Sequence, residues 1–282
     1  MTMKRILSFA VAFVVAMAMV VPTVLTDTKA ATKNVTLTVA GQDTYYDSVA
    51  EAVAVVPKDN TEAVITLNND YKGSGVKVQA GQYVTFDLNG YTWDITDTVG
   101  SSGTETNGMQ LLKDSKVTIM NGTMTSATSK LLIQNYCELT LNDVKLSGAD
   151  NLTQLIVSNN NGKTLITGNT EIKAAAGGNA MDADFWSDNV YTGGNVVLES
   201  GTITGDVVAT NGGKMFLNGG TIYGDVRAEN YGTDKYSEFS GTITMDGVAV
   251  NGNVTAESKG KIIIQNADVT GKVSSNGENK VV

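Results

Sequence analysis

The chain has 282 residues, of which 41% are hydrophobic, so it can bury the core of one large domain or of two small ones. Its formal net charge is −9, which excludes nucleic acid as an expected partner because an acidic protein repels phosphates. It contains no histidine, and this absence excludes histidine-based triads, histidine metal clusters and histidine acid–base catalysis.

Residues 1–30 have the three-part pattern of a secretory signal peptide. Lys4 and Arg5 form a short basic start, an apolar run extends from Ile6 to Val21, and small residues near Ala30 offer a cleavage point. The alternative is a retained membrane anchor. We expect cleavage, no membrane span afterwards, and a mature protein that is secreted, either extracellular or associated with the cell surface.

Residues 31–62 are expected to form an N-terminal cap over the region that follows. The sequence predicts a strand over Val35–Val39 and an amphipathic helix in "SVAEAVAVV", with Asp47 or Ser48 as its N-cap. A further strand over Ala63–Leu67 completes the arrangement. The helix has almost no basic face, so we interpret it as a structural cap and not as a membrane-surface helix.

Residues 63–282 are expected to form a second region, built from repeats. A template of apolar, any, apolar, any, turn, any, any, apolar fits eight segments, from "FDLNGYTW" to "IIIQNADV". Successive copies lie 19 to 31 residues apart, and the turn position always holds a residue that favours turns. The turn residues are Gly90, Asn121, Asp143, Asn169, Ser200, Gly219, Gly247 and Asn266.

The template also predicts which side chains are buried. Its first apolar column aligns Phe86 with Val117, and its third begins at Trp93. Its second contains Thr167, the only residue in the three columns that clearly departs from the apolar pattern. Alternation before each turn indicates strands with one buried face, and stacking buries what a single repeat cannot. We therefore expect an all-β parallel β-helix. A β-sandwich or a propeller is the alternative, but its strands need not share one turn register.

No second cap is visible near the C-terminus, where "TGKVSSNGENKVV" follows the last repeat. The edge of that repeat is therefore capped in a way that the sequence does not reveal, or it pairs with another chain. Self-association through this C-terminal coil is accordingly one expected partnership.

Four N-terminal phrases resemble those of bacterial surface proteins in the pectate-lyase-like superfamily: "YYDSVAEAVAVV", "AVITLNNDY", "VKVQAGQYVTFDLNGYTWDI" and "VTIMNGTMTS". The resemblance covers roughly residues 35–275 and implies a right-handed, single-stranded parallel β-helix with an N-terminal helical cap. That superfamily includes polysaccharide lyases, glycosidases, adhesins and stalk-like cell-wall proteins. The resemblance therefore specifies a fold better than an activity.

A narrower resemblance covers roughly residues 196–275. The phrases "TGDVVA", "YGDVRA", "NGNVTA" and "TGKVSS" are similar to repeats of bactofilins, which polymerise through stacked β-helix ends. The export signal and the irregular N-terminal repeats depart from that family. What this resemblance implies is regular stacking, with end-to-end assembly as an expectation.

The same four phrases define a polar column of Asp206, Asp225, Asn253 and Lys272, with Arg227 beside it. Carboxylates one strand spacing apart, roughly 5 Å, could share a cation or a proton. The superfamily resemblance implies an Arg or Lys base beside calcium-binding carboxylates in its lyases, which would suit Arg227. The alternative, which we favour, is a polar corner exposed to water and turned by the glycine before each member.

The segment "NAMDADFWSDNVYTGG" (Asn179–Gly194) is the strongest candidate ligand site. Alternating carboxylates can ligate Ca²⁺, and an exposed Trp can stack on a sugar ring. No complete calcium-loop pattern is present, so the metal is left open, and no other cofactor is expected. The alternative is a loop whose aromatic residues pack on the flank of the solenoid. The candidate ligand-binding residues are Asp182, Asp184, Trp186, Asp188 and Tyr191.

Two other features are interpreted structurally. Cys137 is the only cysteine, which excludes an intramolecular disulfide, and it is expected to be a small buried hydrophobic residue. The segment "DTVGSSGTETNG" (Asp97–Gly108) is expected to be a mobile loop between the first two repeats.

The sequence as a whole favours a secreted bacterial surface protein with a structural or adhesive role, which recognises a polysaccharide or a host or cell-surface protein. No catalytic residues are assigned, because the repeats occur without a convincing catalytic set. An enzyme, either a lyase or a hydrolase acting on acidic polysaccharide, is the first alternative. A scaffold that assembles itself through its ends is the second.

Overall fold

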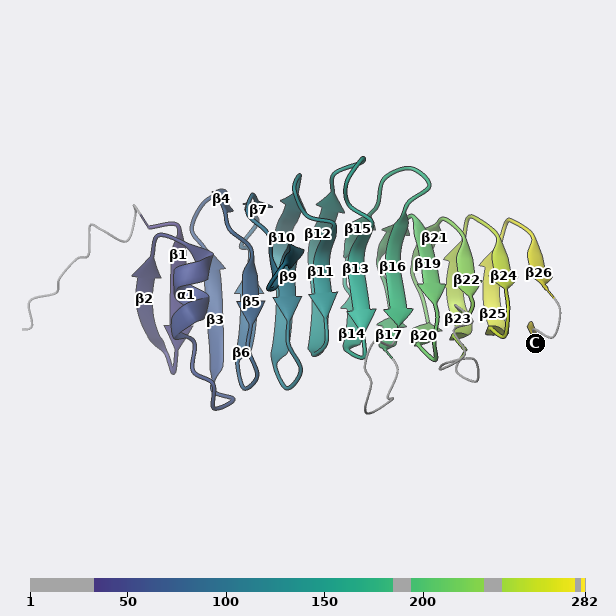
Figure 1. The fold of residues 1–282 in the computed structure, drawn as a ribbon, viewed down its shortest axis with the longest axis horizontal. Coiled ribbons are helices and arrows are strands. Elements are labelled where there is room, and N and C mark those ends of the chain that lie inside the picture. The colour runs from purple at the N-terminus through teal and green to yellow at the C-terminus, as the bar shows by residue number, and fades with distance from the viewer. Residues whose placement is uncertain (1–32, 185–193, 231–239, 277–279, 282) are drawn as a thin grey trace, which may run out of the picture.

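The computed structural model describes residues 33–184, 194–230, 240–276 and 280–281. Over these residues the chain is all-β apart from one helix, α1 (Val49–Val55), and most neighbouring strands are parallel. The strands form a 17-stranded sheet, called sheet A, and a 10-stranded sheet, called sheet B. They follow one another along the long axis from the N-terminal to the C-terminal end (Figure 1). Within this described part, no helix is long and apolar enough to cross a membrane.

Sheet A holds two rows of strands, and each repeat pairs in parallel with the next. The first row is β3 (Glu62–Leu67), β6 (Tyr83–Asp87), β10 (Lys116–Ser126), β12 (Glu138–Gly148), β14 (Lys163–Thr167), β17 (Asn195–Leu198), β20 (Lys214–Leu217), β23 (Thr242–Val250), β25 (Lys261–Val269) and β27 (Lys280–Val281). The second row consists of β4 (Tyr71–Gly73), β7 (Thr92–Ile95), β15 (Glu171–Lys173), β18 (Thr202–Thr204) and β21 (Thr221–Tyr223), with the later halves of β10, β12, β23 and β25.

Sheet B receives the next segment of each repeat. Its parallel strands are β5 (Val76–Val78), β9 (Thr104–Leu111), β11 (Leu131–Asn135), β13 (Leu155–Asn160), β16 (Asn179–Asp184), β19 (Asp206–Ala209), β22 (Val226–Ala228), β24 (Val254–Ala256) and β26 (Val273–Ser275). The strand β8 (Val99–Ser101) pairs antiparallel with the start of β9. The segment expected as a mobile loop, Asp97–Gly108, is therefore largely a β-hairpin.

The core is built from columns of inward-pointing aliphatic and aromatic side chains. Its central ring contact is between Phe86 and Trp93, whose centroids lie 5.8 Å apart. The column predicted to begin at Trp93 is confirmed by the strand registers: Trp93, Met124, Leu146, Ile172, Ile203, Ile222, Val250 and Val269. Burial of these stacked apolar side chains is the main source of hydrophobic stabilisation.

The other two columns differ from the template in two repeats. Phe86 pairs with Ile119 and not with Val117. Leu141 pairs with Ile166, so Ile166 and not Thr167 occupies the second apolar column, and that column has no polar residue at this repeat. Leu165, which the template placed inside, is 37% exposed. The template assumed a turn of constant length, but the turns of these two repeats are longer. Because side chains alternate along a strand, a shift of one residue exchanges its faces.

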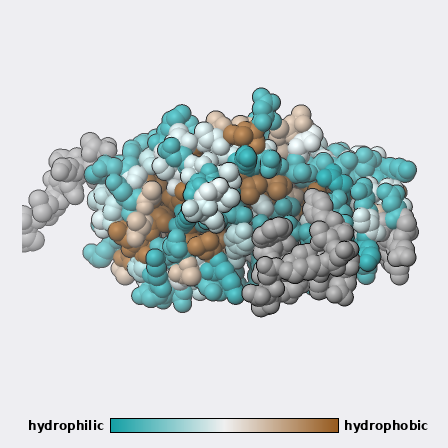
Figure 2. All heavy atoms as spheres, viewed as in Figure 1, coloured by the Kyte–Doolittle hydropathy of each residue, from teal (hydrophilic) through white to brown (hydrophobic). Residues whose placement is uncertain are grey.

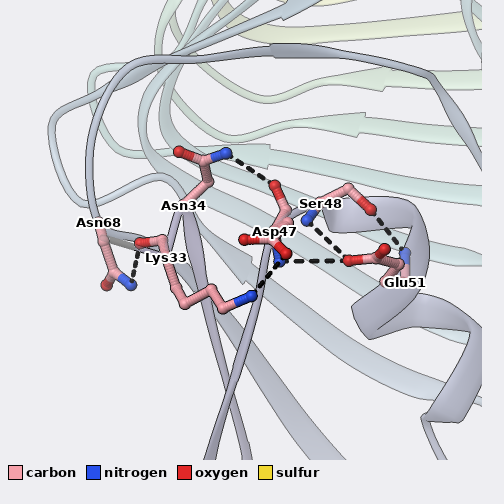
Figure 3. A network of polar contacts seen from close by, with 6 residues as sticks. All are labelled: Lys33, Asn34, Asp47, Ser48, Glu51 and Asn68. Atoms are coloured by element: carbon pink, nitrogen blue, oxygen red, sulfur yellow. Dashed lines mark hydrogen bonds and ion pairs between the residues drawn. The ribbon is translucent and has the colours of Figure 1, made fainter. Parts of the chain in front are cut away.

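The N-terminal end holds the predicted strand and helix, as β1 (Val35–Val39) and α1, together with β2 (Gln42–Tyr46); we call these three elements the cap. Ser48 is the N-cap, which decides between the two candidates. Its hydroxyl accepts a hydrogen bond from the Glu51 backbone at 3.1 Å, and the Glu51 carboxylate accepts one from the Ser48 backbone at 3.2 Å. Figure 3 shows how Asp47 joins this capping box to Lys33, which it contacts at 2.5 Å. The cap is thus tied to the chain that enters β1.

Glycines occupy one corner of the C-terminal repeats because successive backbones approach closely there. A Cβ on Gly224 would lie 2.2 Å from the carbonyl oxygen of Gly205, and one on Gly252 would lie 2.0 Å from that of Gly224. Gly271 stands in the same relation to Gly252, at 2.2 Å. The glycine that precedes each member of the polar column is therefore required by packing, whether or not anything binds beside it.

Candidate functional site

Sheet B places a row of side chains on the side away from the core. Its strands alternate, so the residues after buried Ile133, Val157 and Met181 point outward. The registers align these outward residues across the sheet: Lys77, Gln110, Gln134, Ser158, Asp182, Val208, Arg227, Thr255 and Ser274. We call this side of the sheet the sheet B face.

The sheet B face holds a neutral stretch beside an acidic strand. Strands β9 to β13 contribute the neutral Gln110, Gln134 and Ser158, whereas β16 contributes Asp182 and Asp184. On the side of the molecule drawn in Figure 2, hydrophilic residues cover much of the described surface, and hydrophobic ones gather in the N-terminal part and in the middle. The polar row therefore lies on a surface that is open to polar partners.

A hollow of about 320 Å³ lies on the neutral stretch of the sheet B face, from β9 to β13, and is bordered by the β8–β9 hairpin. Strands β9, β11 and β13 supply its floor, and the hairpin supplies hydroxyl groups. Its lining is Ser101, Thr104, Thr106, Asn107, Gln110, Leu131, Gln134, Tyr136 and Asn160. We call this hollow the amide groove. Almost every group in it is an uncharged donor or acceptor.

The side-chain amides of the groove are held by one another. The Gln134 carbonyl oxygen accepts hydrogen bonds from the amide nitrogens of Asn107, at 2.8 Å, and Gln110, at 3.0 Å. Among the described residues, no hydrogen bond uses the amide nitrogen of Gln134, so it remains a donor for a ligand. The three amides are thus fixed in position before a ligand arrives, which lowers the entropy cost of binding.

Tyr136 closes the groove at the end of β11. Burial raises the pKa of its phenol, and the charges of Asp182 and Asp184 raise the pKa further, while a hydrogen bond with Asn160 lowers it. The phenol therefore stays neutral at physiological pH and presents an aromatic ring with a polar tip. An aromatic ring beside a few fixed polar groups is typical of pockets that bind small molecules.

Asp182 and Asp184 lie on the same face, two residues apart on β16. Asp182 accepts a hydrogen bond from the Asn159 backbone at 2.8 Å, and Asp184 accepts one from the Asn211 amide at 3.0 Å. Burial raises the pKa of Asp182 to about 7, and the charge of Asp184 contributes to the rise. Trp186, Asp188 and Tyr191, the other predicted ligand-binding residues, lie outside the described residues.

Calcium binding by this cluster is not supported by the part of the chain that the structure describes. No group of three or more acidic, cysteine or histidine side chains there is arranged to hold a metal ion. Two carboxylates alone provide too few oxygen ligands for Ca²⁺, which takes six to eight. The predicted Ca²⁺ site therefore stays a prediction that depends on residues outside the described ranges.

The polar column of Asp206, Asp225, Asn253 and Lys272 stacks as predicted. Side chains of this column accept hydrogen bonds from the backbone of the next repeat. The Asp206 carboxylate accepts a hydrogen bond from the Asp225 backbone at 2.9 Å, and the Asp225 carboxylate accepts one from the Asn253 backbone at 2.7 Å. The Asn253 side chain accepts one from the Lys272 backbone at 3.0 Å. These hydrogen bonds give the polar column a structural use.

Arg227 is held in place by an ion pair. Its guanidinium contacts the Asp206 carboxylate at 2.5 Å and the Asn179 side chain at 3.2 Å. Burial by itself would lower the pKa of Arg227, but the hydrogen bond and the charge of Asp206 outweigh burial and raise it. A guanidinium held protonated in this way is a poor general base. Arg227 nevertheless lies in the same outward row as Asp182.

The residues of the amide groove were not predicted from the sequence, although a signal for them exists. Gln110, Gln134, Ser158 and Asp182 follow one another at intervals of 24 residues, as their hydrogen-bonded pairs show. The template followed apolar positions and turns only, so this polar periodicity was overlooked. The hairpin that borders the groove has no repeat signal at all.

Cys137 is buried, as predicted, and burial raises the pKa of its thiol to about 12. A thiol with so high a pKa is not a nucleophile at physiological pH.

Comparison of the chain with family models, with curated proteins and with solved structures gave no match. The candidate site is therefore defined by its own geometry.

Proposed function

We propose that the chain is a secreted, surface-associated adhesive protein that binds carbohydrate on its sheet B face. The observation that carries this proposal is the amide groove, where three mutually hydrogen-bonded amides lie beside the Tyr136 ring. Sugar hydroxyls both donate and accept hydrogen bonds, so fixed amides match them without selecting a charge. The signal-like residues 1–30 support export of the mature chain.

The fold proposed for this role is a right-handed, single-stranded parallel β-helix with an N-terminal helical cap. It is supported by the parallel pairing of successive repeats in sheets A and B and by the return of each repeat to the same three strand positions. A solenoid of this kind presents one long face of regularly spaced side chains. An extended polymer is the natural partner of such a face.

A glycan array tests the proposal. Wild-type protein should bind at least one oligosaccharide, and Gln134→Ala should lose at least tenfold in affinity for it, because Gln134 holds the other two amides and offers the free donor. Gln265→Ala, an exposed amide on β25, is the matched control and should bind like wild type. Equal binding by Gln134→Ala and wild type would contradict the proposed site.

An enzyme acting on acidic polysaccharide is the alternative with less support. The best base candidate, Arg227, is paired with Asp206, and the carboxylates of Asp206 and Asp225 accept hydrogen bonds from the backbone. A lyase would release unsaturated uronates, which absorb ultraviolet light. We expect no such product from this chain.

Self-assembly through the C-terminal repeat is a second candidate function, and the exposure of one side chain favours it. Val273 is 43% exposed, whereas Val254, its partner in the preceding strand, is fully buried. An exposed valine at a core-facing register suits contact with a second chain. A scaffold role is compatible with glycan binding, since the two surfaces are different.

A further inference from the structure

A second hollow, of about 470 Å³, lies where the chain turns from sheet B into the first row of sheet A. It spans the turns before β10, β12 and β14 and includes the starts of those strands. We call it the corner pocket. Tyr136 lines both the corner pocket and the amide groove, so the two hollows adjoin.

The corner pocket concentrates lysines on an acidic protein. Its lining contains Lys113, Lys116 and Lys163 against the two carboxylates of Asp114 and Glu138. Its formal charge is therefore +1, whereas that of the whole chain is −9. Because the rest of the molecule repels anions, a local positive site is where a negatively charged group is most stable.

The strand registers fix the order of these charges. Lys116 pairs with Glu138, and Glu138 pairs with Lys163, so the three lie on consecutive strands about 5 Å apart. Lys163 contacts Glu138 at 3.2 Å. Lys116 instead lies over the Tyr83 ring, 5.9 Å from its centroid.

Lys113 completes the set from the turn before β10. It is exposed, and no ion pair or hydrogen bond of the described residues involves its ammonium group. Lys113 and Lys116 therefore stand without a carboxylate partner among the contacts described, and two ammonium groups remain for an incoming anion.

The pocket also offers groups that suit a sugar ring. The rings of Tyr83 and Tyr136 line it, and an aromatic ring can pack against the apolar face of a sugar. Lysines and aromatic rings together fit a sugar that bears a negative charge.

We propose that the corner pocket binds an anionic sugar residue of the same polymer whose neutral residues occupy the amide groove. This inference rests on the proposed carbohydrate-binding function and specifies its ligand class. The pocket lacks the planar guanidinium fork that would select a carboxylate, so the shared chemistry is a singly charged group, either a uronate or a sulfate ester. Tyr136 lies between the amide groove, which takes the neutral sugar, and the corner pocket, which takes the anionic one.

Titration calorimetry with three hexasaccharide probes tests this inference. The probes are a hyaluronan oligomer, in which uronates alternate with neutral sugars, its carboxyl methyl ester, and a sulfated galactan oligomer. Wild-type protein should bind at least one charged probe at least tenfold more tightly than the methyl ester at low salt. That preference should shrink as salt rises.

The Lys113→Gln/Lys116→Gln variant should lose that preference and bind the charged probe and the methyl ester alike. The matched control is Lys72→Gln/Lys145→Gln, which removes two exposed, ion-paired lysines of the other row of sheet A and should behave like wild type. All four lysines are exposed, so the variants should fold normally.

The outcomes separate this inference from the proposed function. If wild type binds charged and esterified probes equally, or if the Lys113→Gln/Lys116→Gln variant keeps the preference, the anionic pocket is refuted while glycan binding stands. If binding survives Gln134→Ala but not the lysine changes, the amide groove is refuted and the corner pocket stands alone. If no probe binds, both proposals fail for these polymer classes.

Discussion

At the scale of single residues, the polar groups of the sheet B face are divided between structure and recognition. Asp206, Asp225 and Asn253 use their side chains to bind the backbone of the next repeat. Gln134, in contrast, holds two neighbouring amides and keeps its own nitrogen available. Residues with similar polarity therefore have different uses, and only their contacts distinguish them.

Asp182→Asn should make the protein more stable at pH 8 and change little near pH 4.5. The pKa of Asp182 is raised from 3.8 to about 7, so between these pH values the folded chain holds a proton that the unfolded chain has released. The free energy of unfolding therefore falls as pH rises through this window, and the loss is complete above about pH 7. Removing the carboxylate should restore about 2 kcal/mol at pH 8.

Urea denaturation at both pH values measures this effect. Asp268→Asn serves as the control, since it removes an exposed carboxylate on β25. A variant at position 182 that is no more stable than wild type at pH 8 would refute the burial of this charge.

At the scale of elements, the sequence predicted the repeating strands well and their exact faces less well. The α1 helix, the strand Val35–Val39 and the column that begins at Trp93 are confirmed. The pairing of Phe86 and the burial of Leu165 were wrong, because turn length varies between repeats. Apolar alternation identifies a strand, but only the register shows which face is buried.

The candidate site was harder to predict than the fold for a physical reason. The core needs apolar side chains in every repeat, so its pattern recurs eight times in the sequence. A binding surface needs its polar groups in one place only, and those groups come from strands 24 residues apart and from a hairpin without a repeat. The predicted residues Asp182 and Asp184 lie on the sheet B face but do not line the amide groove.

Gly224→Ala should destabilise the protein by about 1–3 kcal/mol, since the added methyl group must displace backbone. Its Cβ would lie 2.2 Å from the Gly205 carbonyl oxygen. Gly178→Ala is a suitable comparison because its nearest heavy atom would be 3.2 Å away, and it should cost clearly less. Denaturant midpoints measure both variants. Equal stabilities would show that the glycine corner is not tightly packed.

At the scale of the whole molecule, the parallel registers place binding groups in rows along one axis. The amide groove and the corner pocket adjoin at Tyr136, and the carboxylates of Asp182 and Asp184 on β16 would repel an anionic polymer. A charged glycan should therefore occupy the neutral stretch of the sheet B face, from β9 to β13, and not extend onto β16. The apolar core runs beneath this surface.

The most direct test of carbohydrate binding in the amide groove is hydrogen–deuterium exchange with and without the best oligosaccharide from the array. We predict that backbone amides of the β8–β9 hairpin, at residues 99–106, exchange at least tenfold more slowly in the complex, while those of the exposed cap strand β2 do not change. Slower exchange confined to another part of the chain, with the hairpin unchanged, would contradict the account.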